Sequence, residues 1–247
     1  MTLCRDKCPP VAYPILHFMQ QILLDIHAHG RQKCGSAVVS GSPAEVMDMI
    51  ENGCPGPFSA GIHPWATQNL GVEGMNLELA RLERVVELPC VVAVGEVGLD
   101  ALRGASLALQ EFVFRRQVEI SEAVGKPLVL HVVRTGHRLM ELCKTLQREL
   151  PQGIRQPWIW HGFRGSPQQA DQFLALREKN YLSFGERFNP AAAAAVNPGR
   201  MLVETDEADM PLSRVVDNVA DALSTDAFSL SGIIQANLSC IFPAIHE

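Results

Sequence analysis

Short apolar runs recur along the chain, and longer amphipathic segments lie between them. The runs have the length and the Val, Ile and Leu content of buried parallel strands. They cover residues 23–26, 37–39, 59–62, 91–95, 127–130, 158–160, 181–184 and 201–205. Six of the eight runs lead directly into a residue that can bind a metal ion. The pattern predicts eight strands connected by helices.

The segments between the runs place their apolar residues at helical spacing. Ser42, Pro43 and Glu45 form a capping box that starts one helix, and Gly53 ends it. Further helices are predicted at 77–88, 107–124, 137–150 and 167–179, with a last one at about 226–241. Eight βα steps without a Gly-x-Gly-x-x-Gly fingerprint favour the α/β class and a distorted (β/α)8 TIM-type barrel with an extra C-terminal helix.

The length of 247 residues fits one such barrel. We expect residues 1–18 to be a peripheral extension that precedes Met19, and residues 19–247 to form a single domain. The stretch 11–24 contains Pro14, His17 and two glutamines. It is too polar for a membrane span or for the core of a signal peptide. No membrane partner is therefore expected, and the sequence defines no oligomeric state.

Charge and cysteine content narrow the class of protein further. The net charge is −6, and no run of Lys and Arg indicates nucleic-acid binding through the field of the whole protein. A phosphate substrate would have to be attracted locally. Seven cysteines, an odd number without a secretory signature, predict reduced thiols and a cytoplasmic location. Cys4 and Cys8 could pair or bind a metal, but a loose N-terminus is the simpler interpretation.

Potential metal ligands gather at the C-terminal ends of the predicted strands. His27 and His29 are two residues apart, so their side chains point the same way in an extended segment. Any single residue of this kind is commonly incidental. Five of the eight histidines nevertheless share this position, and active sites of (β/α)8 barrels lie at that end of the strands. The full set is His27, His29, His63, Glu96, His131, His161 and Asp206.

The mixture of imidazole and carboxylate groups suits zinc, manganese or iron better than an ion that prefers oxygen alone. A set of this size is too large for one tetrahedral zinc, which takes four ligands. Two divalent ions about 3.5–4 Å apart, bridged by a carboxylate, would use them all and would form the clamp that phosphoryl hydrolysis requires. We expect two ions, with zinc, manganese and magnesium as the candidates.

The order of these motifs resembles the TatD family of metal-dependent hydrolases, within the amidohydrolase-like barrels. The resemblance covers roughly residues 22–242. It is carried by His27-Ala28-His29, Gly61-Ile62-His63-Pro64, Gly95-Glu96-Val97-Gly98-Leu99-Asp100, Gln110, Phe114, His131-Val132-Val133-Arg134, His161-Gly162-Phe163-Arg164-Gly165 and Glu204-Thr205-Asp206.

The resemblance implies a division of the ligands between two ions. His27, His29 and Asp206 would hold one ion, and Glu96 would bridge it to the other. The second ion would be held by His131 and His161. Asp206 would also act as the base on the attacking water.

The resemblance also places His63 and Arg134 against the substrate. Arg134 and Arg164 could clamp phosphate oxygens, and His63 could donate a proton to a phosphate oxygen or to the leaving group. Simpler roles are open for two of them: Arg134 could pair with a neighbouring carboxylate, and His63 could bond the backbone. Asp25 and Glu204, each two residues before a predicted ligand, are expected behind the ligands or in the barrel interior.

Three departures from the family pattern affect the predicted substrate. Trp65 stands where relatives often carry a second histidine, Ala101 where an aromatic residue is common, and the segment after Asp206 is short. The metal ligands are kept while the walls around the substrate are changed. The sequence predicts a TatD-like deoxyribonuclease or phosphodiesterase. Alternatives are a hydrolase of small amide, ester or cyclic C–N substrates, and a metal-binding barrel without catalysis.

Overall fold

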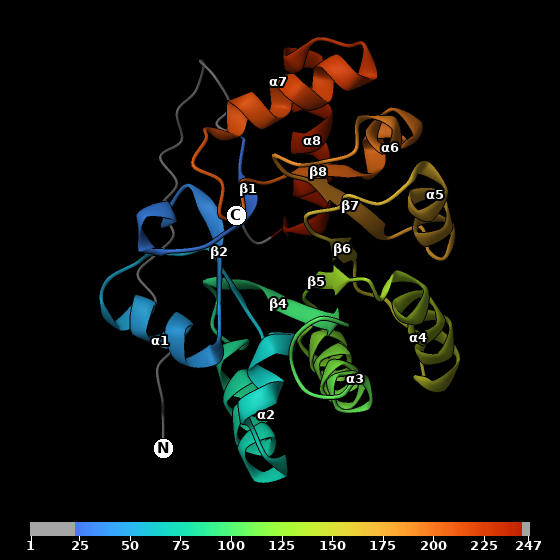
Figure 1. The fold of residues 1–247 in the computed structure, drawn as a ribbon. Coiled ribbons are helices and arrows are strands. Elements are labelled where there is room, and N and C mark those ends of the chain that lie inside the picture. Colours follow the sequence, from blue (N-terminus) through green and yellow to red (C-terminus); the bar gives the residue numbers. More distant parts are fainter. Residues whose placement is uncertain (1–22, 244–247) are drawn as a thin grey trace.

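Eight parallel strands form one sheet in chain order, from β1 to β8. The computed structural model describes residues 23–243 of the chain. Helices surround the strands on the outside (Figure 1), which confirms the (β/α)8 prediction. The strands are β1 (Asp25–Ala28), β2 (Ala37–Gly41), β3 (Phe58–Ala60), β4 (Val91–Asp100), β5 (Leu128–Val133), β6 (Trp158–Trp160), β7 (Asn180–Phe184) and β8 (Met201–Val203).

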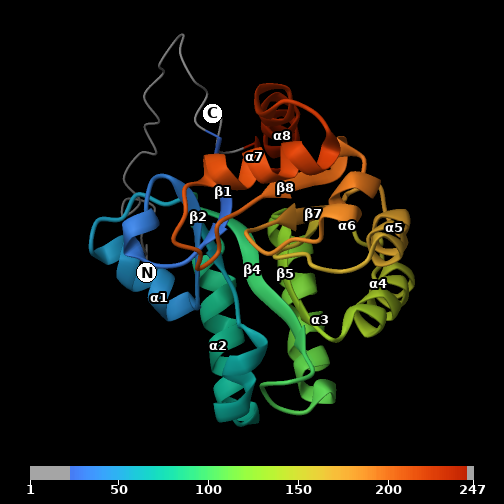
Figure 2. The ribbon, with the colours of Figure 1, turned by 45° about the horizontal axis from the view of Figure 1, so that its top comes forward.

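All six helices that were predicted with bounds are present, α6 and α7 occur in addition, and the predicted extra helix, α8, packs at the end of the chain (Figure 2). The α-helices are α1 (Pro43–Glu51), α2 (Val72–Val85), α3 (Leu107–Val124), α4 (Gly136–Glu149), α5 (Pro167–Ala175), α6 (Pro190–Ala195), α7 (Leu212–Leu223) and α8 (Ala227–Ile241). Three short 3-10 helices complete the set: η1 (Arg31–Lys33), η2 (Pro64–Asn69) and η3 (Pro198–Arg200).

The barrel closes through a short seam between β1 and the segment after β8. Instead of a strand ladder, a single bridge joins Ala28 to Asp206, whose amide donates to the carbonyl of His27 at 2.9 Å. Below it, the buried carboxylate of Asp25 accepts from the amide of Thr205 at 3.1 Å and from its hydroxyl at 2.6 Å. The first and last strands therefore meet at two potential metal ligands. The barrel is therefore nearly closed, with a shorter contact here than between its other neighbouring strands.

Strand β4 continues five residues beyond the predicted run, to Asp100, and is buried along its whole length. Its close approach to β5 depends on Gly98, since a Cβ atom there would collide with the backbone carbonyl oxygen of His131. Gly98 also adopts a φ of 146°, which side chains rarely tolerate. This contact brings Glu96 on β4 and His131 on β5 to the same end of the barrel.

The prediction of reduced thiols is wrong for Cys34 and Cys54, which form a disulfide, and for Cys90, which is also disulfide-bonded. Cys34 ends η1 and Cys54 follows α1. The amide of Gly35 donates to the carbonyl of Gly56 at 3.2 Å, so the two segments run side by side. A separation of 20 residues gives no sign of this pairing in the sequence. Cys143 and Cys240 are free.

The predictions for the start of the chain lie outside the described residues. These are the peripheral extension at 1–18 and the state of Cys4 and Cys8. The single-domain boundary at residue 19 lies there as well. Between residues 23 and 243, no helix combines the length and the apolar character that a membrane crossing requires.

Candidate metal centre

The centre is built around the carboxylate of Glu96, which is only 7% exposed. Strand β4 carries it to the end of the barrel where the neighbouring strands deliver their histidines. Five imidazole rings have a nitrogen within 3.6 Å of this carboxylate. The distances are 2.5 Å for His131, 2.7 Å for His161, 3.3 Å for His63, 3.4 Å for His27 and 3.6 Å for His29. The structure thus brings together all five histidines that the sequence singles out.

Asp206 completes one group of three potential ligands with His27 and His29. Its Oδ1 atom lies 3.5 Å from Nε2 of His29 and 3.8 Å from Nε2 of His27. The ring of His27 is fully buried, and among the described residues neither of its nitrogens has a hydrogen-bond partner. A buried polar atom without a partner destabilises a fold. A cation held by His27 would remove this cost, so the residues present fit a metal ion.

His131 and His161 each contact a second carboxylate through the ring nitrogen that does not face Glu96. Nε2 of His131 lies 3.2 Å from Oδ2 of Asp100, and Nδ1 of His161 lies 3.1 Å from Oε1 of Glu204. The other nitrogen of each ring faces Glu96. Such a carboxylate fixes the tautomer and leaves a lone pair for a metal, as in most histidine metal ligands. Asp100 appeared in the sequence only as part of a motif, although a carboxylate at the end of a strand is a signal that could have singled it out.

Among residues 23–243, four groups of three residues have potential ligand atoms close enough together to hold one metal ion. They are His27, His29 and Asp206; His27, Glu96 and His161; His63, Glu96 and His131; and His161, Glu204 and Asp206. The first group is the predicted set for one ion. None of the four combines His131 with His161, which instead share Oε1 of Glu96. The assignment of these two histidines to one ion stays a prediction.

His63 combines the two roles that the sequence left open. Its Nδ1 accepts a hydrogen bond from the backbone amide of Trp65 at 3.1 Å, so in the neutral ring the proton sits on Nε2. Nε2 faces the carboxylate of Glu96. Burial lowers the pKa of His63 and keeps the ring neutral. The side chain is therefore arranged as a hydrogen-bond donor toward the centre.

The electrostatics of the centre favour a buried pair of opposite charges. Burial opposes the ionisation of Glu96, but His161 and the other rings that bond it hold its pKa well below the usual range. Burial likewise disfavours the charged form of His161, yet Glu96 and Glu204 raise its pKa well above the usual value. Metal binding requires deprotonated ligands, so an ion must displace this proton. Affinity for metal should therefore rise with pH.

Two cavities meet at the centre and share Asp206 and Glu207 in their walls. The larger one, about 940 Å³, is lined by five of the six predicted metal ligands, all except the buried His27, and extends over the start of α1 and over Trp65. We call it the large cleft. The smaller one, about 270 Å³, lies beside Glu204 and is called the small cavity. Asp206 stands on the wall between them and is partly exposed.

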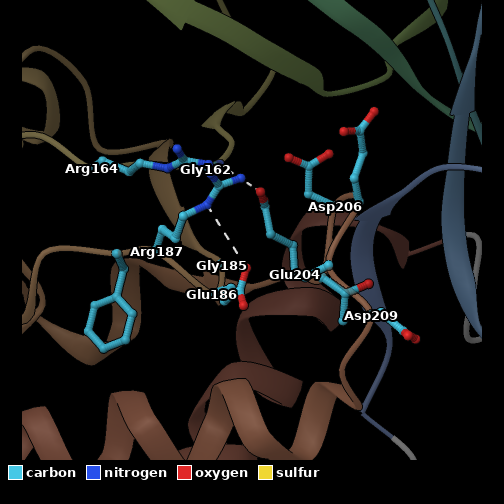
Figure 3. A pocket seen from close by; sticks show the side chains of 12 residues that line it. Gly162, Arg164, Gly185, Glu186, Arg187, Glu204, Asp206 and Asp209 are labelled. Carbon is cyan, nitrogen blue, oxygen red and sulfur yellow. Dashed lines mark hydrogen bonds and ion pairs between the residues drawn. The ribbon is translucent and has the colours of Figure 1, made fainter.

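Two arginines reach into the small cavity from one side and face Glu204 and Asp206 (Figure 3). One is Arg164, a predicted phosphate contact, and the other is Arg187, which the sequence reasoning missed. Arg187 follows β7 by three residues, so the same position after a strand could have singled it out. Its guanidinium lies 3.9 Å from Glu186. The predicted contact Arg134 is exposed and is not among the residues that line either cavity.

Trp65 is the second residue whose contacts the sequence does not reveal. Its indole N–H donates to Oδ2 of Asp100 at 2.6 Å, the same oxygen that bonds the ring of His131. The guanidinium of Arg103 lies over the indole, 4.4 Å from the ring centre. The residue that departs from the family pattern is therefore connected to the metal ligands.

The family model described as TatD related DNase matches residues 27–240. The chain belongs to the TatD family. It is 30% identical over 192 residues to the uncharacterised metal-dependent hydrolase YjjV of Escherichia coli, an alignment that covers 72% of this chain and 70% of that protein. Like that relative, this TatD protein is a metal-dependent hydrolase.

Two further comparisons support this assignment. The 3'-5' ssDNA/RNA exonuclease TatD of Edwardsiella piscicida is 33% identical over 119 residues, which span 48% of this chain but only 42% of the exonuclease. The crystal structure of the E. coli YjjV protein matches with a TM-score of 0.72 and 24% identity, and covers 90% of this chain and 98% of that one. This last likeness shows the shared barrel fold.

Proposed function

We propose that this TatD protein hydrolyses phosphodiester bonds in single-stranded nucleic acid. The observation that carries the proposal is the position of Asp206, which contacts two histidines of the centre and separates two cavities of different character. The names of several relatives as single-strand DNA and RNA exonucleases support the choice of substrate. The potential metal ligands support metal-dependent hydrolysis as the type of reaction.

Two divalent ions would be held by the six residues of the predicted set. His27, His29 and Asp206 fit one ion, and Glu96 lies where its two oxygens can serve both. Such ions supply Lewis acidity and a water nucleophile at neutral pH. The nitrogen-rich ligand set favours zinc or manganese over magnesium. Elemental analysis of reconstituted protein should find two ions per chain, whereas a value near zero would contradict the two-ion proposal.

Asp206 would accept the proton from the attacking water. Its carboxylate is partly exposed on the wall between the cavities, so it can reach a water on the substrate side while it contacts His27 and His29. A general base must lie within hydrogen-bond reach of the proton that it removes. Among the carboxylates of the centre, Glu96, Asp100 and Glu204 are buried and each contacts at least one histidine ring, which leaves the partly exposed Asp206 for this step.

The substrate phosphate would lie between the centre and the small cavity. Arg164 and Arg187 supply positive charge. The planar guanidinium group of an arginine can donate two parallel hydrogen bonds to the oxygens of a phosphate. His63 presents its Nε2 proton from the side of the large cleft and would stabilise an oxygen of the phosphate or leaving group. Arg134, exposed beyond β5, would make at most a peripheral contact.

The large cleft would hold the nucleotides next to the cleaved bond. Its volume of about 940 Å³ is near the upper end of the range for ligand pockets, so it accommodates more than a single small group. Its walls include apolar residues such as Ile62, Leu70 and Met49. An unpaired strand can place sugars and bases against such walls, whereas a duplex keeps its bases stacked inside.

A substrate panel tests the proposal against its alternatives. Metal-loaded protein should release nucleotides from a labelled single-stranded oligonucleotide, cleave the matching duplex more slowly and leave simple amides and cyclic amides intact. Faster hydrolysis of amides would favour the C–N hydrolase, because the same ions polarise carbonyl groups. Protein that holds two ions and converts nothing would favour the non-catalytic barrel.

We also propose the cytoplasm as the location of the protein. The odd number of cysteines supports this proposal, whereas the disulfide bonding of Cys34, Cys54 and Cys90 points toward an oxidising compartment. Cell fractionation combined with alkylation of thiols before lysis would decide. Protein in the cytoplasmic fraction with Cys34 alkylated would support the proposal, and disulfide-bonded protein in another fraction would overturn it.

A further inference from the structure

We propose that Trp65, backed by Arg103, is a stacking surface for the nucleobase beside the cleaved phosphodiester. The inference rests on the proposed function and specifies how the substrate is held. It is carried by the juxtaposition of an exposed, fixed indole with a guanidinium at the edge of the large cleft, next to the metal ligands.

The indole lies close enough to the centre for this role. Its ring centre is 4.7 Å from that of His63 and 5.8 Å from that of His131, and Trp65 lines the large cleft. A base that stacks on it would belong to a nucleotide adjacent to the reacting phosphate. Trp65 is 43% exposed, whereas Trp158 and Trp160 are buried in the barrel. Trp65 is therefore the single indole of the described chain that a ligand can reach.

The orientation of the indole is fixed before any ligand binds. Its N–H bonds Asp100 at 2.6 Å, and its backbone amide bonds the ring of His63 at 3.1 Å. The guanidinium of Arg103 lies over the ring at 4.4 Å from its centre. Ordering a free side chain on binding costs affinity, and a side chain already held avoids that cost. These contacts provide a rigid aromatic surface with a positive charge beside it.

The chemistry of the surface identifies its ligand as an unpaired base. Aromatic side chains stack on any nucleobase, and an adjacent arginine adds an interaction with the base or the backbone. Bases inside a duplex are already stacked on their neighbours and cannot reach an indole at the edge of a cleft. A stacking residue at this position therefore favours single strands without selecting a base sequence.

A second role for Trp65 has to be separated from stacking. Because its N–H bonds Asp100, the side chain could act by positioning His131. Trp65→Phe keeps an aromatic face and removes the N–H, whereas Trp65→Ala removes both. A stacking role predicts that the Phe variant keeps most of the affinity for a base-containing strand. A purely positioning role predicts that both variants lose kcat equally on every substrate.

The experiment uses metal-loaded protein and a fluorescein-labelled thymidine octamer with phosphorothioate linkages that resist cleavage. The matching octamer with abasic sugars is the control ligand. Anisotropy should show that Trp65→Ala binds the thymidine strand about 10-fold or more weakly, within the range measured for one stacked base, and binds the abasic strand within about twofold of wild type. The matched control Phe228→Ala removes an exposed aromatic residue that lines neither cavity and should change neither affinity.

Tryptophan emission provides a readout that does not depend on turnover. The unlabelled thymidine strand should quench the emission of wild-type protein, the abasic strand should quench it much less, and Trp65→Phe should lose the response while it keeps its affinity. Equal affinity of wild type for both strands, or an unchanged affinity in Trp65→Ala, would overturn the stacking proposal. If cleavage of ordinary strands persists in that case, the proposed function stands without the stacking surface. Binding of the base without cleavage of any phosphodiester would instead refute the proposed function alone.

Discussion

Glu204 holds the ring of His161 from the side opposite to Glu96. Its Oε1 atom lies 3.1 Å from Nδ1 of His161 and also accepts a hydrogen bond from the amide of Gly162 at 2.7 Å. The same ring contacts Glu96 through Nε2 at 2.7 Å. A single buried carboxylate therefore fixes both the orientation of this histidine and the backbone that follows it.

Replacing Glu204 by Gln should weaken metal binding while the fold is kept. Glutamine retains an oxygen that can bond Nδ1 but removes the charge that supports the basicity of His161. Loss of such a partner commonly lowers metal affinity by about 10–100-fold. Zinc competition with a chelating dye measures the change. Asp209→Asn, an exposed carboxylate of the same cavity, is the matched control, and an equal loss in that variant would contradict a specific role of Glu204.

The stability of metal-free and metal-loaded protein should depend on pH with opposite signs. In metal-free protein the pKa of His161 is raised above 6.5, so its contribution is fully present below pH 6.5 and is lost as pH rises through the folded-state pKa. The pKa of Glu96 is lowered below 4.5, so its contribution is present above pH 4.5 and is lost as pH falls through its folded-state pKa. Without metal, the free energy of unfolding should therefore be highest between about pH 4.5 and pH 6.5.

With metal present, a rise in pH removes competing protons from the ligands and should increase the stability. Urea titrations between pH 5 and 8, in chelator and in excess zinc, measure both trends. Parallel curves in the two conditions would show that His161 and Glu96 do not control the metal-free state.

Asp206→Asn should separate proton transfer from metal binding. Asparagine keeps the size and one oxygen, and like aspartate it tolerates the left-handed backbone that Asp206 adopts, with a φ of 53°. Turnover should fall by roughly 100-fold or more while most of the metal stays bound. Asp206→Ala would confuse the result with backbone strain. Near-normal turnover of the Asn variant with both ions bound would show that Asp206 is not the base.

The three arginines should differ in their effect on phosphodiester hydrolysis. Arg164→Met and Arg187→Met each remove a charge from the small cavity, and a charged hydrogen bond contributes about 1.5–3 kcal/mol. We therefore expect roughly 10-fold or greater losses in kcat/KM on a phosphodiester and little change on a neutral amide. Arg134→Met, outside both cavities, should have a smaller effect. The reverse order of losses would place the phosphate on the side of β5.

Removing the Cys34–Cys54 disulfide should lower the free energy of unfolding by about 3 kcal/mol, the value typical of a closed loop of this length. Guanidinium titration of the double Ser variant in the absence of reductant measures the loss. Cys240→Ser, at an exposed free thiol, should have no effect. Burial raises the pKa of Cys143 to about 11, so iodoacetamide at pH 8 should modify Cys240 and spare Cys143. A non-reducing peptide map without the Cys34–Cys54 crosslink would contradict the pairing.

Strands and helices with a clear pattern of apolar residues in the sequence were predicted well. Strand β6 and helix α3 have the predicted bounds, since the first is a compact apolar run and the second a long amphipathic repeat. Strand β4 extends beyond the predicted run because residues 97–100 still pair with β5, although the apolar run ends at residue 95. Helix α6 escaped prediction because its five alanines form no apolar face.

In the candidate site, too, some features could be predicted from the sequence and others could not. The five histidines were found because they share a position after apolar runs, which a linear sequence displays. The contacts of Trp65 with Asp100 and of Arg187 with the small cavity depend on how separate βα units face each other. The disulfide depends on the path of the chain around α1. Contacts of this kind arise from tertiary packing and leave no periodic signal.

Because of the bridge between Ala28 and Asp206, the centre can assemble only after β8 and the segment that follows it have been synthesised. A growing chain that has left the ribosome only as far as β7 already carries every histidine of the centre. It still lacks Glu204, which orients His161, and Asp206, which we assign as the base. The hydrolase is therefore completed only when its last strand docks against its first. An unfinished chain, or one cut after β7, would contain every histidine of the centre but would lack the residue that we assign as the base.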